Sequence, residues 1–150
     1  MFQIQHHDAF TVIGLPLRTN NREGFQTIPA HWQRFFAEQW AGRIPGRQGD
    51  DVVALYTEFE HAGRDNLGDY RFVIGVPVQP GAVPPEGCIQ VDVPAVRCAV
   101  FEVERGHPER VGEAWRSIWQ HDADTLPRRF TCDHERYQPD GHIHIAVGLR

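Results

Sequence analysis

The feature that most constrains the fold is an order of expected elements that occurs twice along the chain. In each half, a strand pattern is followed by an amphipathic helix pattern and then by two more strand patterns. One such unit cannot bury the apolar face of its helix alone, whereas two units side by side can join their sheets. The sequence therefore predicts an α+β domain, in which duplicated strand-helix-strand-strand units form a mostly antiparallel sheet with two helices and a central cleft.

The expected elements follow the apolar periodicity and the turn residues between them. Strands are expected at residues 10–18, 52–59, 70–78, 96–103, 130–137 and 142–149, with a short extended piece at 89–93, and helices at 28–40 and 108–119. The Pro- and Gly-rich residues 80–87 are expected to be a semi-rigid connector. We therefore expect one domain over residues 1–150, with pseudo-repeats at about 8–79 and 88–150.

Prolines mark two positions in the first half. Thr27 is expected to be the N-cap of the first helix, because Pro29 then falls in its first turn. Pro16 has no N–H to donate, so the first strand is expected to be an edge strand or to bulge there.

Charge and cysteine content exclude several classes of protein. The formal net charge of −5 argues against a nucleic-acid surface. No apolar run approaches the roughly 20 residues that span a bilayer, so no membrane contact is expected. The three cysteines are scattered and form no CxxC pair, which predicts neither a disulfide framework nor a thiolate zinc site. A cytoplasmic protein with reduced thiols is expected.

The strand expected at residues 130–137 carries the main candidate for function. Alternation places Asp133, Glu135 and Tyr137 on one face, with Thr131, and Phe130, Cys132 and His134 on the other. If the first face lines an aromatic cleft, the carboxylate of Glu135 is a fixed negative charge for a cationic, apolar ligand. If that face meets water, Glu135 is an ordinary solvated carboxylate, as most charged residues are.

The two halves also correspond in their polar and aromatic residues. Tyr56-x-Glu58 corresponds to Glu135-x-Tyr137, and Trp32-x3-Phe36 corresponds to Trp115-x3-Trp119. Aromatic faces attract cations, although most such side chains serve core packing. The candidate ligand-binding residues are Glu135, Tyr137, Tyr56, Glu58, Trp32, Phe36, Trp40, Trp115 and Trp119.

No motif indicates a metal, a cofactor or a catalytic centre. His142 and His144 share a strand face, and His6-His7 lie near the N-terminus, but a catalytic zinc site needs three converging ligands. Neither HExxH nor GxSxG nor a phosphate-loop pattern occurs. We therefore expect no cofactor, no metal site and no assigned catalytic residue.

Three stretches resemble a known family over about residues 10–149. They are Tyr70-x4-Gly75-x-Pro77-Val78, then Val93-Pro94-Ala95 running into Cys98-Ala99-Val100-Phe101 with Gly106, Ala114-Trp115 and Ile118-Trp119, and finally Glu135-Arg136-Tyr137. Together they resemble the GyrI-like small-molecule-binding domain, the effector-binding domain of AraC- and MerR-type multidrug-responsive regulators. The family usually has an aromatic or aliphatic residue before the glutamate, whereas this chain has His134.

The resemblance implies a stand-alone binding domain for lipophilic, often cationic compounds, because the chain has no room for a helix-turn-helix. It also implies that Glu135 meets the positive charge of the ligand. Two alternatives stay open. The same cleft could belong to a hydrolase with Glu135 as general base, oriented by Tyr56 or Tyr137. The domain could also bind a protein partner, such as a regulator or gyrase, as the family name implies.

Overall fold

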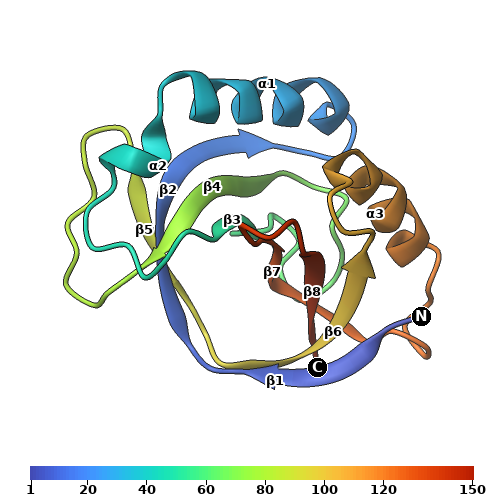
Figure 1. The fold of residues 1–150 in the computed structure, drawn as a ribbon. Helices are drawn as coiled ribbons and strands as arrows, with labels where there is room; N and C mark the ends of the chain where they lie inside the picture. The colour runs from blue at the N-terminus through green and yellow to red at the C-terminus, as the bar shows by residue number, and fades with distance from the viewer.

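The computed structural model describes residues 1–150 as one curved sheet with helices along one face (Figure 1). Its strands are β1 (Gln3–His7), β2 (Phe10–Thr19), β3 (Val52–Thr57), β4 (Tyr70–Val78), β5 (Ile89–Val93), β6 (Val96–Val103), β7 (Arg128–Tyr137) and β8 (Ile143–Leu149). Its helices are α1 (Gly24–Ala37), α2 (Trp40–Arg43), the 3-10 turn Pro108–Arg110 and α3 (Val111–Trp119). No helix is long and apolar enough to cross a bilayer.

The sheet has eight strands in the order β1-β6-β8-β7-β3-β4-β2-β5, and every pair is antiparallel. The predicted α+β class and the mostly antiparallel sheet are therefore confirmed. The order reads β6-β8-β7 on one side of the β7–β3 pair and β2-β4-β3 on the other. This arrangement is what two strand-helix-strand-strand units would give, and the predicted pseudo-repeats at about 8–79 and 88–150 stay a prediction.

Strands β1 and β5 complete the sheet by reciprocal exchange between the halves. β1 precedes β2 along the chain but pairs with β6, and β5 precedes β6 but pairs with β2. No sequence pattern indicated β1, because four of its five residues are exposed and it lacks an apolar alternation. β5 reaches only as far as Gly14, so Pro16 lies where β2 has one neighbour and needs no second hydrogen bond.

The first helix starts earlier than expected. α1 begins at Gly24, so Thr27 lies inside the helix, and the expected N-cap at Thr27 is wrong. The side chain of Asn20 accepts from the backbone N–H groups of Arg22 and Glu23, which supplies the acceptor before the first turn. At the other end, Gln39 has a left-handed backbone with φ of 55°, which separates α1 from the short α2.

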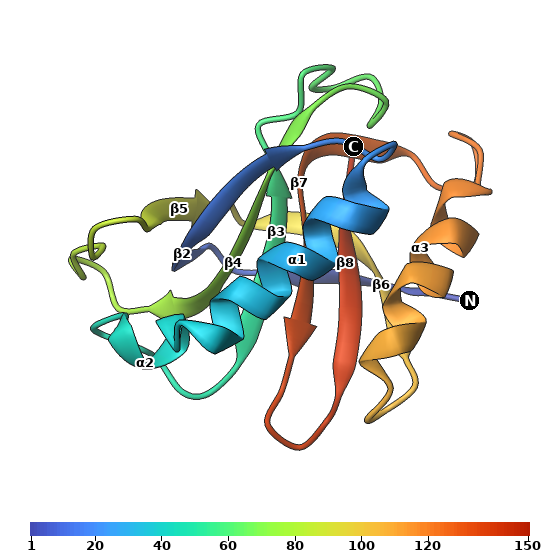
Figure 2. The ribbon, with the colours of Figure 1, turned by 90° about the horizontal axis from the view of Figure 1, so that it is seen from above.

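Helices α1 and α3 lie side by side on the same face of the sheet (Figures 1 and 2). Beneath them are two apolar clusters, one around Phe35 and Phe72 and the other around Trp115 and Ile145. A third cluster, around Val53 and Leu55, packs against the opposite face of the same central strands. Both faces of the central sheet are therefore buried, and the gap between α1 and α3 is where the site forms.

Glycine is required at one position where the paired strands β2 and β4 lie in very close contact. Gly14 and Gly75 are register partners, and a Cβ on Gly75 would lie 2.2 Å from the carbonyl oxygen of Ile13. That atom belongs to the backbone of a neighbouring strand, so it cannot rotate away. The two strands can therefore approach this closely only because neither glycine has a Cβ atom.

We expect Gly75→Ala to lower the free energy of unfolding by about 1–3 kcal/mol, the usual cost of forcing extra volume into a packed interior. Urea unfolding of the purified protein measures the change. Gly42→Ala is the matched control, because no atom lies within 4 Å of a Cβ there and the helix should tolerate it. A Gly75→Ala protein as stable as the parent would show that the two strands can separate freely.

Candidate functional site

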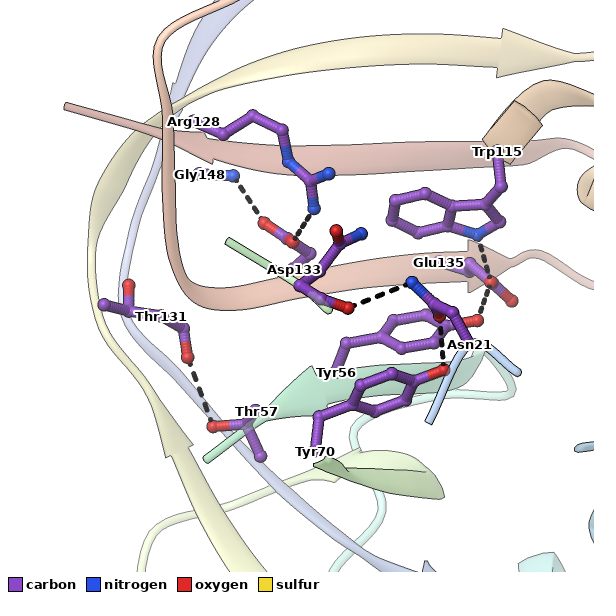
Figure 3. Close-up of polar contacts among 11 residues, drawn as sticks. Asn21, Tyr56, Thr57, Tyr70, Trp115, Arg128, Thr131, Asp133, Glu135 and Gly148 are labelled. Atoms are coloured by element: carbon purple, nitrogen blue, oxygen red, sulfur yellow. Dashed lines mark hydrogen bonds and ion pairs between the residues drawn. The ribbon is translucent and has the colours of Figure 1, made fainter. Parts of the chain in front are cut away.

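Glu135 lies at the centre of the sheet, on the face beneath α1 and α3, and is 2% exposed. Its carboxylate accepts three hydrogen bonds and has no cationic partner. Oε2 accepts from Tyr56 Oη at 2.6 Å and from Trp115 Nε1 at 2.7 Å (Figure 3), and Oε1 accepts from Tyr137 Oη at 2.5 Å. The negative charge is therefore held by neutral donors only.

The fold brings these donors together from three elements. Tyr137 is two residues along β7 and shares the face of Glu135. Tyr56, on β3, is the register partner of Asp133, so it reaches Glu135 diagonally across the β3–β7 pair. Trp115 comes from α3 above the sheet, with its ring 5.1 Å from that of Tyr56. The centre of the site thus joins both halves of the chain.

Burial determines the protonation of this cluster. Burial raises the pKa of Glu135 above its ordinary value, and the hydrogen bonds from Tyr137, Tyr56 and Trp115 oppose that rise. Burial, together with the nearby Glu135 carboxylate, raises the pKa of Tyr56 and of Tyr137 well above 10. The same two causes raise the pKa of Tyr70 to about 12. The tyrosines are therefore neutral donors at any physiological pH.

A cavity of about 410 Å³ lies over Glu135, between α1 and α3. Ile28 and Trp32 line it from α1, and Val111, Trp115 and Trp119 line it from α3. The ring of Trp32 stands edge-on to that of Tyr137, with the centroids 5.1 Å apart. The walls are therefore largely apolar and aromatic, and the charge of Glu135 lies at the base, which suits an apolar molecule that carries one positive charge.

An ion pair lies beside Glu135 at the same cavity. Arg128 Nη2 donates to Asp133 Oδ2 at 2.7 Å, and the backbone N–H of Gly148 donates to Asp133 Oδ1 at 2.9 Å (Figure 3). The Arg128 and Asp133 side chains are only 8% and 1% exposed. Because the charges of the two cancel, Glu135 is the one buried charge of the cavity without an ion-pair partner, and the exposed Arg116 also lines the cavity.

Six of the nine candidate residues line this cavity. They are Trp32, Tyr56, Trp115, Trp119, Glu135 and Tyr137. The structure does not bring Glu58, Phe36 or Trp40 to it. The role of all nine in binding stays a prediction.

The three residues outside the cavity have separate reasons for their positions. β3 ends at Thr57, and Glu58 has a left-handed backbone with φ of 49°, so its carboxylate turns to solvent and pairs with Arg71. Phe36 is 61% exposed and stacks on the outer side of Trp32. Trp40 is buried at α2, where its ring N–H donates to Glu38.

Several cavity residues were not among the predicted site residues. Alternation placed Asp133 on the face of Glu135, but Asp133 was not named as a candidate. Tyr70 was noted only as the first residue of a stretch that resembles the family, and Phe25 carried no signal beyond its apolar character. Arg128 could not have been found, because the register of β7 against β8 is interrupted between Arg128 and Asp133, and Phe130 has a left-handed φ of 56°.

The cavity over the antiparallel sheet, between helices on one face, is the arrangement that the sequence resemblance to effector-binding domains predicts. The chain belongs to the Cass2 family of integron-associated effector binding proteins, whose profile matches residues 3–149. The sequence resemblance to GyrI-like effector-binding domains is thereby confirmed. The transcriptional regulator BrlR of Pseudomonas aeruginosa is 28% identical over 119 residues, which are 79% of this chain and 40% of BrlR. The chain therefore spans less than half the length of that regulator.

Two solved structures have the same fold. An integron cassette protein from the mobile metagenome of Vibrio cholerae superposes with a TM-score of 0.78 at 21% identity, covering 99% of this chain and 95% of the other. SAV2435, whose structure is bound to tetraphenylphosphonium, superposes with a TM-score of 0.81 at 16% identity, covering 100% and 94%. At these identities the likeness is one of fold.

Proposed function

We propose that this protein binds lipophilic, cationic small molecules in the cavity between α1 and α3, as a sensor of such compounds or to sequester them. The observation that carries the proposal is the buried Glu135 carboxylate, which accepts three neutral hydrogen bonds but has no cation beside it. A buried charge without a counter-charge is costly, so a cationic ligand gains more here than it would at the surface.

The aromatic walls support the same ligand chemistry. Trp32, Trp115 and Trp119 all line the cavity, and the faces of such rings attract cations as well as packing against planar apolar groups. Among the structural relatives, SAV2435 carries tetraphenylphosphonium, a large apolar cation of this kind. The similarity to BrlR supports a role in effector sensing, because the region of BrlR that matches this chain is part of a longer transcriptional regulator.

Fluorescence of the three cavity tryptophans provides a direct binding assay. We expect saturable quenching when lipophilic cations are titrated in, and weaker quenching with neutral analogues of the same shape. The hydrolase alternative predicts instead that a bound electrophilic compound is turned over, and the protein-partner alternative predicts binding to gyrase or to a regulator without a small ligand. A panel in which no lipophilic cation binds would end the proposal.

The proposal predicts that cation affinity depends on pH with a defined sign. Burial raises the pKa of Glu135, and only the ionised form attracts a cation. Affinity for a permanently charged phosphonium should therefore fall as the pH drops through the pKa of Glu135, by up to about tenfold for each pH unit below it, until the roughly tenfold to hundredfold loss expected without the charge is reached. By linkage, a bound cation should lower the pKa of Glu135.

Tryptophan quenching measured across a series of pH values tests this prediction. Neutral analogues serve as the ligand control, since they should bind equally at all pH values where the protein is folded. The Glu135→Gln variant serves as the protein control, since it has no carboxyl group to protonate at this position. A phosphonium affinity that is flat over the whole range, or a slope that survives in Glu135→Gln, would assign the charge to another group.

A further inference from the structure

A second cavity, of about 280 Å³, lies on the opposite face of the sheet from the first. His134 and Arg136 flank Glu135 along β7, so alternation turns both of them to this face. His144 on β8 is the register partner of Arg136. His7 at the end of β1, with Asp8 and Phe10 after it, closes the cavity from the other side.

The imidazole of His134 is buried in this cavity without a hydrogen-bond partner. It is 4% exposed, and neither its ring nor that of His144 forms a hydrogen bond within the protein. The ring centroid of His134 lies 5.5 Å from that of His7 and 6.2 Å from that of His144. Buried polar groups are normally paired, so these ring nitrogens are donors and acceptors available to a ligand.

The groups that act on the pKa of His134 by their charge are all basic. Burial lowers the pKa of His134 well below 6.5, and the charges of Arg136, His7 and His144 lower it further. Burial is also the main cause of the lowered pKa of His144, which Glu102 and Asp51 oppose. Asp51 is paired with Arg136 at 2.8 Å. Asp8 is the one carboxylate among the residues that line the cavity.

The donor set distinguishes between ligand classes. No group of three or more His, Cys, Asp and Glu side chains is arranged to hold a metal ion. Arg136 uses one of its guanidinium nitrogens on Asp51, and its other N–H groups form no hydrogen bond to the protein. Imidazole N–H groups and a guanidinium are the groups that bind oxyanions.

We propose that this second cavity binds a small oxyanion, a sulfate-, phosphate- or carboxylate-bearing group, through Arg136, His134 and His144. Binding draws a proton onto the imidazoles, because an anion offsets the mutual repulsion of the cationic groups. The site is independent of the first cavity, since the two lie on opposite faces of the sheet. It requires neither the cationic ligand nor Glu135.

Sulfate is the probe of choice, because its charge is constant over the relevant pH range. In NMR titrations that observe the imidazole nitrogens, sulfate should shift the signals of His134, His144 and His7 with one common dissociation constant. Affinity should rise as the pH falls, by up to about tenfold per pH unit for one proton taken up, and the rise should continue below pH 6.5, because burial lowers the pKa of His134 in the free protein. Acetate, titrated in parallel, tells a planar carboxylate preference from a tetrahedral one, and chloride controls for ionic strength.

Substitutions locate the effect. His134→Phe retains an aromatic ring among its aromatic neighbours but removes the donors, and it should weaken sulfate by about tenfold or more. His144→Gln should weaken sulfate in the same direction and decides the matter if His134→Phe does not fold. The distant, exposed His107→Gln should leave sulfate binding unchanged, as should Glu135→Gln. Shifts that do not saturate, that chloride reproduces, or that both cavity variants retain would overturn the proposal.

Discussion

Arg128→Met should lower the free energy of unfolding by about 3–5 kcal/mol, the usual effect of removing one partner from a buried ion pair. Arg128 is the only cation bonded to Asp133, and that carboxylate is 1% exposed. Without the guanidinium, one N–H bond from Gly148 remains to hold a negative charge away from water. Methionine fills much of the same volume, so the loss reports the unpaired charge rather than a cavity.

Chemical denaturation of three variants separates charge from packing. The double variant Arg128→Met/Asp133→Asn removes both charges and should recover much of the lost stability. Arg34→Met removes the exposed Arg34–Glu38 pair, whose side chains are 52% and 43% exposed, and should change stability little. A single Arg128→Met variant as stable as the parent would show that Asp133 is protonated or hydrated in the folded protein.

Glu135→Gln should weaken binding of a lipophilic cation by about 1–3 kcal/mol, the range for a hydrogen bond or contact to a charged group. That is roughly a tenfold to hundredfold increase in the dissociation constant. The amide has the shape of the carboxylate but carries no charge, so neutral ligands of the same shape should change little. The fold should be kept or stabilised, because the buried charge is removed.

Glu58→Gln is the matched control for this substitution. In the sequence repeat, the Tyr56-x-Glu58 pair corresponds to the Glu135-x-Tyr137 pair. Glu58 lies at the surface and pairs with Arg71, so its charge should not affect cation binding. If Glu135→Gln binds cations and neutral analogues as the parent does, Glu135 is not the charge that selects the ligand. If it binds unchanged but loses a turnover activity, the hydrolase alternative replaces the binding function.

The sequence predicted the parts of the site that depend on a regular backbone. Alternation along residues 130–137 placed Glu135 and Tyr137 on one face, and the helical spacing placed Trp115 and Trp119 over it. Both predictions hold because β7 and α3 are regular through these positions. Four of the six candidate residues that line the cavity lie on these two elements.

The remaining features depend on backbone irregularity and on pairing between distant strands. The strand predicted at 52–59 would have put Glu58 beside Tyr56, but a left-handed residue ends the alternation at that point. Arg128 joins the site because β7 is irregular near Phe130, which no periodicity could indicate. The register partners of β1 on β6 lie 89 to 97 residues away along the chain, so nothing local in its five residues identifies it.

The most direct test of the central claim compares two ligands of nearly the same shape and opposite charge. Tetraphenylphosphonium and tetraphenylborate differ in the sign of one central charge, so the aromatic walls should treat them alike and Glu135 should not. Isothermal titration of the unmodified protein should give saturable binding of the phosphonium and, for the borate, binding at least about a hundredfold weaker, equivalent to about 2.7 kcal/mol. Equal affinity for the two ions, or tighter binding of the borate, would contradict the account of Glu135 as the charge that selects cations.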